Sequence, residues 1–144
     1  MKTYFISGHR NVTQEEFNEH YTPRIIEALR EGASFVIGDY HGVDTMAQLL
    51  LRKLKAENVV VYHMFDSPRN CMGFERRGGF TSDSARDAAM TILSDEDILW
   101  VRPSVRQSVS GKLSGTEENE RRRMLLKWIY LSEGSLYGLL PPMQ

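Results

Sequence analysis

Short apolar runs alternate along the chain with longer segments in which apolar residues recur every three or four positions. The runs are rich in β-branched and aromatic residues, which predicts buried strands at residues 4–6, 35–37, 59–62 and 98–101. Buried strands that alternate with amphipathic helices are typical of a parallel sheet covered by helices. We therefore predict an α/β domain, a three-layer Rossmann-like fold with a mainly parallel sheet.

The first helical pattern has recognisable ends. Thr13 and Glu16 have the spacing of a capping box, and Gly32 can close the pattern that follows them. Because Pro23 lies inside it, the segment is either one kinked helix or two shorter helices. Further helical patterns cover residues 45–54, 84–93 and 114–131. Residues 65–84 and 103–113 show no periodic spacing of apolar residues, which predicts loops. The first of these loops is long enough to form a lid.

Composition narrows the class of protein. With 144 residues, 41% of them hydrophobic, we expect one domain over residues 1–144. The lone Cys71 excludes an internal disulfide and favours a reducing, cytoplasmic setting. Neither a leader in the first ten residues nor an apolar run of roughly 20 residues is present, so we expect no membrane partner. A net charge of −1 disfavours nucleic acid as a partner and leaves small nucleotides as the better candidates.

Three segments combine glycine with polar side chains where strands lead into helices: residues 7–10, 38–44 and 114–118. Ligands of parallel α/β sheets bind at such ends, and a helix amino terminus favours an anion such as phosphate. For any one segment a tight turn with an N-cap is the commoner explanation, and it is the presence of three on one sheet edge that favours a ligand. Neither a Walker loop nor a Gly-x-Gly-x-x-Gly motif occurs. The candidate binding residues are Ser7, Gly8, His9, Arg10, Gly38, Asp39, Gly42, Asp44, Ser114, Gly115, Thr116 and Glu117.

These motifs together resemble the SLOG superfamily of Rossmann-like nucleotide-binding proteins. The resemblance is carried in order by a strand with Ser7-Gly8, by Gly38-x-x-x-Gly42-Val43-Asp44, by Arg86-Asp87 and by Ser114-Gly115-Thr116, and it covers roughly residues 2–130. The superfamily includes the DNA-processing protein A family, the Lonely Guy phosphoribohydrolases and, more distantly, nucleoside deoxyribosyltransferase-like enzymes. The resemblance implies a nucleotide or nucleotide-sugar ligand across the sheet edge, with its phosphate near Thr116.

The resemblance also implies catalytic positions. In the phosphoribohydrolases, an arginine on the helix before the fourth strand and a glutamate three residues after the Gly-Thr threonine act on the N-glycosidic bond. Arg86 matches the arginine, whereas the glutamate position falls on Asn119, between Glu118 and Glu120. A shift by one residue turns a helical side chain by about 100°. We predict Arg86 and Glu118 as catalytic residues, with no cofactor and no metal.

We therefore expect a nucleotide- or nucleoside-binding protein that hydrolyses or transfers at the N-glycosidic bond of a nucleoside monophosphate. The alternatives are a non-catalytic sensor of a nucleotide-derived signal and a DNA-processing module. Asp44 could contact ribose or cap the helix that follows, and acidic residues such as Glu117 also complement a helix dipole. Trp128 and Ile129 could form a contact between copies in a homo-oligomer or pack in the core. Residues 121–123 are basic, which a solvated face or ion pairs between subunits would explain.

Overall fold

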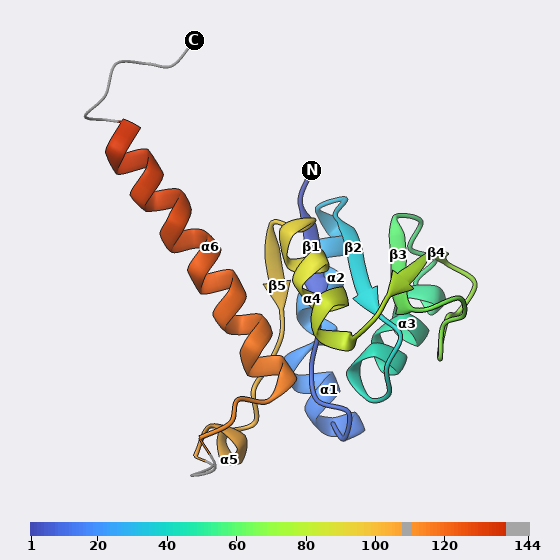
Figure 1. Cartoon of the computed structure of the whole chain (residues 1–144). Coiled ribbons are helices and arrows are strands. Elements are labelled where there is room, and N and C mark those ends of the chain that lie inside the picture. Colours follow the sequence, from blue (N-terminus) through green and yellow to red (C-terminus); the bar gives the residue numbers. More distant parts are fainter. Residues whose placement is uncertain (108–110, 138–144) are drawn as a thin grey trace.

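A parallel sheet organises the chain, as the hydrophobic pattern predicts. The computed structural model describes residues 1–107 and 111–137. All strand pairs in its sheet are parallel, in the order β4-β3-β2-β1-β5 (Figure 1), which confirms the predicted fold class. The strands are β1 (Thr3–Ile6), β2 (Ser34–Gly38), β3 (Val59–Met64), β4 (Glu75–Phe80) and β5 (Glu96–Ile98).

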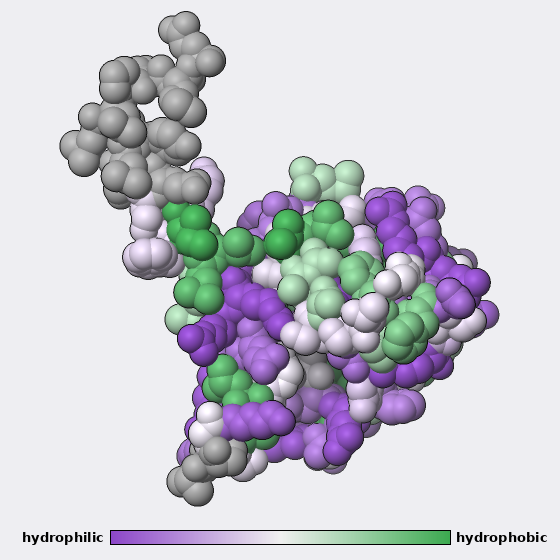
Figure 2. Space-filling model, viewed as in Figure 1, coloured by the Kyte–Doolittle hydropathy of each residue, from purple (hydrophilic) through white to green (hydrophobic). Residues whose placement is uncertain are grey.

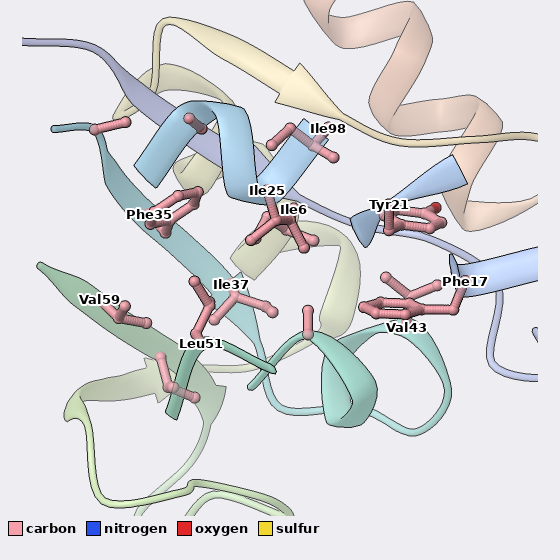
Figure 3. Close-up of a cluster of buried hydrophobic side chains, with 14 of the residues drawn as sticks. Ile6, Phe17, Tyr21, Ile25, Phe35, Ile37, Val43, Leu51, Val59 and Ile98 are labelled. Carbon is pink, nitrogen blue, oxygen red and sulfur yellow. The ribbon is translucent and has the colours of Figure 1, made fainter. Parts of the chain in front are cut away.

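Helices cover both faces of the sheet. On one face, Ile25 and Leu51 pack against Ile6, Ile37 and Val61 of the strands (Figure 3). On the other face, Met90 packs against a smaller set of apolar residues from β1, β2 and β3. The central strands β1, β2 and β3 are covered on both faces, so their residues are mainly apolar. The helices are α1 (Gln14–His20), α2 (Thr22–Arg30), α3 (Val43–Lys53), α4 (Asp83–Ile92), α5 (Pro103–Arg106) and α6 (Gly115–Tyr137).

Local signals at the first helical segment are confirmed. Thr13 and Glu16 form the capping box that opens α1, and Pro23 lies in the first turn of α2, where its missing N–H costs no helical bond. The segment is therefore two short helices. Gly32 follows α2 with a φ of +76°, a left-handed conformation that glycine adopts without strain.

Two predictions of irregular structure are wrong. Residues 65–84 contain β4 and the start of α4, and residues 103–106 form the short helix α5. Strand β4 has the sequence Glu-Arg-Arg-Gly-Gly-Phe and is mostly exposed at the edge of the sheet. Its existence depends on hydrogen bonding to β3 rather than on burial, so it leaves no apolar period in the sequence.

The last strand is shorter and earlier than predicted, because the chain leaves the sheet after Ile98. The backbone N–H of Trp100 donates to the hydroxyl of Tyr21 at 3.0 Å instead of continuing the ladder. The guanidinium of Arg24 donates to the carbonyls of Asp97 and Leu99. Tyr21, between α1 and α2, and Arg24 of α2 thus hold the backbone that follows β5.

Helix α6 is attached to the body through Arg123. Its guanidinium is buried and donates to the carbonyl and hydroxyl of Ser94 and to Asp97, so the prediction of a solvated basic face is wrong for this residue. Beyond Arg123 the helix projects from the body (Figure 1). None of the helices within residues 1–107 and 111–137 has the length and apolarity that crossing a bilayer requires.

Candidate functional site

The three glycine-containing segments meet at one cleft of about 400 Å³. It lies beyond the carboxyl ends of β1 and β2, beside the first turn of α6. Strand β1 lies between β2 and β5, so this is the point at which the strand order reverses and where ligands of such sheets bind. The cleft is lined by Phe5, Ser7, Gly8, His9, Arg10, Asn11, Gly38, Tyr40, His41, Asp44, Asp83, Arg86, Asp87, Ser114, Gly115, Thr116 and Asn119.

Most predicted site residues line this cleft, and four do not. Asp39 is buried behind it and pairs with arginines, while Gly42 precedes α3 with a φ of +72° against the backbone of the β1 loop. Glu117 caps α6, because its carboxylate accepts the N–H of Ser114 at 3.0 Å. Glu118 faces Arg122 at 3.7 Å with 44% of its side chain exposed. Its catalytic role stays a prediction.

Glycines shape the cleft in two different ways. A Cβ on Gly8 would collide with the hydroxyl of Tyr21 and with Val43, and a Cβ on Gly38 would lie 2.6 Å from a carboxylate oxygen of Asp44. These two glycines permit close packing of the strand ends. A Cβ on Gly115 would meet nothing within 4 Å, so this glycine leaves open space in the cleft.

One side of the cleft is suited to an anion. At the start of α6 the hydroxyl of Ser114 accepts the N–H of Glu117, whereas the N–H groups of Gly115 and Thr116 have no acceptor within residues 1–107 and 111–137. The buried hydroxyl of Ser7 likewise has no hydrogen-bond partner in that part of the chain. Arg10 is exposed and makes no ion pair with a described residue. Unpaired donors and a cation at a helix amino terminus favour negative charge.

The cleft is also lined by acidic residues, which Arg86 organises. This buried guanidinium lies 2.7 Å from Asp39, 2.9 Å from Asp83 and 2.9 Å from Asp87. Burial lowers the pKa of Arg86, but the surrounding carboxylates, Asp87 above all, raise it further, so Arg86 stays charged. Since carboxylates occupy its donors, Arg86 orients acids more readily than it can grip a phosphate.

Asp39 is shared between two arginines. The guanidinium of Arg69 donates to the same carboxylate at 2.8 Å and also pairs with Asp83, which ties the loop after β3 to the site. Burial raises the pKa of Asp39, yet the hydrogen bonds from Arg69 outweigh it and hold that pKa below its ordinary value. The loop that the sequence left open as a lid is therefore anchored at Arg69 to a buried anion.

Asp44 is a buried carboxyl group whose pKa is near neutral pH. Burial raises its pKa from 3.8 to about 7, although the charge of Arg86 opposes the rise. Its Oδ2 accepts the N–H of Tyr40 at 3.0 Å. The alternative role as a helix cap is wrong, because Gly42 is the N-cap of α3 and no side chain caps that end.

Asp87 and Asn119 are site residues that were not singled out as such from the sequence. The amide of Asn119 donates to one oxygen of Asp87 at 2.9 Å, and Arg86 donates to the other. Asn119 is buried and lines the cleft at the position where the resemblance implies a glutamate. The signal that could have found Asp87 is its place beside Arg86 in the quoted motif.

His9 is a neutral group on the same rim. Its Nε2 accepts the N–H of Arg102 at 3.0 Å, which places its proton on Nδ1. Burial, and then the charge of Arg102, lower its pKa. Among residues 1–107 and 111–137, no three histidine, cysteine or acidic side chains gather as a metal site would require.

The cleft thus combines two chemically different sets of groups. Its lining includes unpaired N–H and O–H donors with Arg10, and also the acidic residues Asp44, Asp83 and Asp87. This arrangement can hold a ligand that carries an anion at one end and hydroxyl or amine donors at the other. Comparison of the chain with protein-family models, with curated proteins and with solved structures finds no match.

Proposed function

We propose that the cleft binds a nucleoside monophosphate and that the protein hydrolyses, or transfers at, its N-glycosidic bond. The observation that carries this proposal is that one cleft, at the point where the strand order reverses, is lined both by unpaired donors that suit an anion and by carboxylates. A nucleoside monophosphate has matching groups, with phosphate at one end and sugar hydroxyls and base at the other. The resemblance to the SLOG superfamily favours the same class of ligand.

In this proposal the phosphate binds at the start of α6. The N–H groups of Gly115 and Thr116 and the hydroxyl of Ser7 donate to its oxygens, and Arg10 supplies a positive charge. The sugar then lies toward Arg86, whose role is to orient acidic groups. Sugar hydroxyls can donate hydrogen bonds to ionised carboxylates. Deprotonated phosphate oxygens only accept hydrogen bonds, so the sugar suits the acidic residues better than the phosphate does.

Cleavage of the bond requires stabilisation of positive charge at the sugar. We assign this to Asp87, because hydrogen bonds from Arg86 and Asn119 hold its two oxygens in a fixed orientation at the cleft. The electron pair of the C–N bond leaves with the base, which takes the proton of Asp44, the carboxyl with a pKa of about 7. Water then adds to the anomeric carbon and returns a proton to Asp44; in a transfer reaction a second base adds instead.

The test is release of free base from nucleosides and nucleoside monophosphates, followed by chromatography. Asp87→Asn should lower the rate by about 10²–10³-fold, the typical cost of losing one electrostatic stabiliser. Glu118→Gln is the matched control, because Glu118 is the carboxylate that directly precedes Asn119 on α6. If Asp87 stabilises the positive charge of the sugar, this variant should keep the rate within about twofold. Thermal unfolding of both variants shows that each is folded. Full activity of Asp87→Asn, or loss only in Glu118→Gln, would overturn the assignment.

One observation favours a second function, a sensor that binds the same ligand without turnover. The position at which the resemblance implies a catalytic glutamate is occupied by Asn119, an amide that donates to Asp87 and accepts from Arg122. Titration calorimetry with each nucleoside monophosphate distinguishes the two. Binding that Gly115→Val weakens, with no free base after long incubation, would establish the sensor and exclude the enzyme.

A further inference from the structure

The segment of α6 after its anchor at Arg123 is apolar and uncovered. From Met124 to Leu131 every residue except Lys127 is a large apolar one, and between 37% and 77% of each is exposed. Figure 1 shows this part of the helix leaving the body, and Figure 2 shows its hydrophobic surface. Most of these side chains are therefore half or more exposed in the part of the chain that the structure describes.

Its pattern differs from that of a surface helix. Successive residues of a helix are about 100° apart around its axis. A run of eight residues with seven apolar side chains therefore presents apolar surface in nearly every direction. A helix that is hydrophobic all round is normally buried in protein. A helix that lies on a membrane has a polar face rich in lysine and arginine, and this run offers only Lys127. The pattern therefore favours a protein partner that surrounds the segment.

The body of the same chain carries a second uncovered apolar patch next to α6. Ile92 and Leu93, at the end of α4, are 73% and 53% exposed, and α4 packs directly against α6. Figure 2 shows hydrophobic surface on the body beside the projecting helix. Each copy thus has both a projecting apolar helix and an apolar patch at its base. A two-fold axis pairs such surfaces reciprocally, since each copy then covers the other.

The amount of surface and the charge also suit a second copy. Nine large apolar side chains in these two places expose on the order of 100 Å² each, a total comparable with the roughly 800 Å² that each partner contributes to a standard interface. The net charge of −1 gives copies little mutual repulsion. We propose that the protein is a homodimer in which residues 124–131 of α6 pack against α6 and the end of α4 of a second copy.

The experiment measures the mass of the full chain in solution by light scattering and sedimentation. The wild type should have about twice the chain mass of 16.6 kDa over roughly a hundredfold range of concentration. The double variant Trp128→Glu, Ile129→Glu should have the mass of one chain and an unchanged thermal unfolding of the body. Leu49→Glu is the matched control, because Leu49 is also 50% exposed but lies on α3; it should remain dimeric.

Tryptophan fluorescence gives a second measurement that does not depend on a variant that folds. In a dimer Trp128 is covered, so acrylamide should quench the tryptophan emission of the chain less within this concentration range than after dilution below it, where the dimer dissociates. A wild type with the mass of one chain throughout this range overturns the proposal. So does dissociation of Leu49→Glu to the same extent as the α6 variant, or a monomeric wild type that binds phosphatidylcholine vesicles through Trp128.

Discussion

Replacement of Asp44 by asparagine tests the buried acidic side of the cleft directly. The asparagine side chain has nearly the same shape, and its carbonyl can still accept the N–H of Tyr40 as the carboxylate does at 3.0 Å. The substitution removes the ionisable carboxyl group, so position 44 no longer binds or releases a proton. Asp44→Asn therefore isolates the consequence of burying an ionisable group beside Arg86 and Asp87.

The size of the effect follows from the two pKa values of Asp44. Its pKa is 3.8 in an unfolded chain and about 7 in the folded protein, because burial penalises the charged form. Between these values the folded protein binds a proton that the unfolded chain does not, so stability is full below pH 4 and is lost as the pH rises toward 7. A tenfold change in proton affinity is worth about 1.4 kcal/mol, which gives a loss of about 4 kcal/mol across this range.

The assay is urea unfolding of the wild type and of Asp44→Asn at a series of pH values from 4 to 8. Other groups titrate in both proteins, so the informative quantity is the difference between their unfolding free energies. From pH 4 to pH 8 the wild type should lose about 4 kcal/mol of unfolding free energy relative to Asp44→Asn, and half of this loss should have occurred at a pH between these values. A difference that stays constant with pH would refute the reasoning, because Asp44 would then have the same proton affinity folded and unfolded.

Two further predictions concern groups that shape the cleft. The buried hydroxyl of Tyr21 donates to the carbonyl of Ser7 at 2.8 Å and accepts the N–H of Trp100 at 3.0 Å. Tyr21→Phe leaves both backbone groups unpaired and should lower the free energy of unfolding by about 1–3 kcal/mol for each. Urea unfolding checks this, and an unchanged midpoint would contradict it. Gly115→Ala should leave the thermal unfolding midpoint unchanged, because the added Cβ meets nothing within 4 Å, but should weaken nucleoside monophosphate binding about tenfold in calorimetry. Gly8→Ala is its control and should unfold at a lower temperature, since there the Cβ collides with Tyr21.

Features that depend on neighbouring residues could be predicted from the sequence. The capping box of Thr13 and Glu16 and the left-handed Gly32 are set by residues within one turn of each other. The buried strands could be predicted because a strand covered on both faces must be apolar throughout. Strand β4 could not, because an exposed edge strand is held by pairing with β3 and leaves no such pattern.

The approximate place of the cleft was also accessible from the sequence. Parallel strands end at one edge of a sheet, so segments that follow β1 and β2 must come near each other, wherever the helices lie. The chemical state of its side chains was not accessible. The sequence predicts Arg86 only as a catalytic residue, and the folded chain alone shows three carboxylates within 2.9 Å of it.

The sequence by itself thus determined the kind of sheet, the local ends of helices and which segments share an edge, since these follow from periodicity and from contacts between near neighbours. Tertiary structure alone decided which acid faces the cleft and in which protonation state. Glu118 and Asn119 are neighbours in the sequence, but the packing of α6 against α4 buries the amide of Asn119 and leaves the carboxylate of Glu118 partly exposed. Asp44 holds its proton near pH 7 because the distant parts of the chain that surround it exclude water.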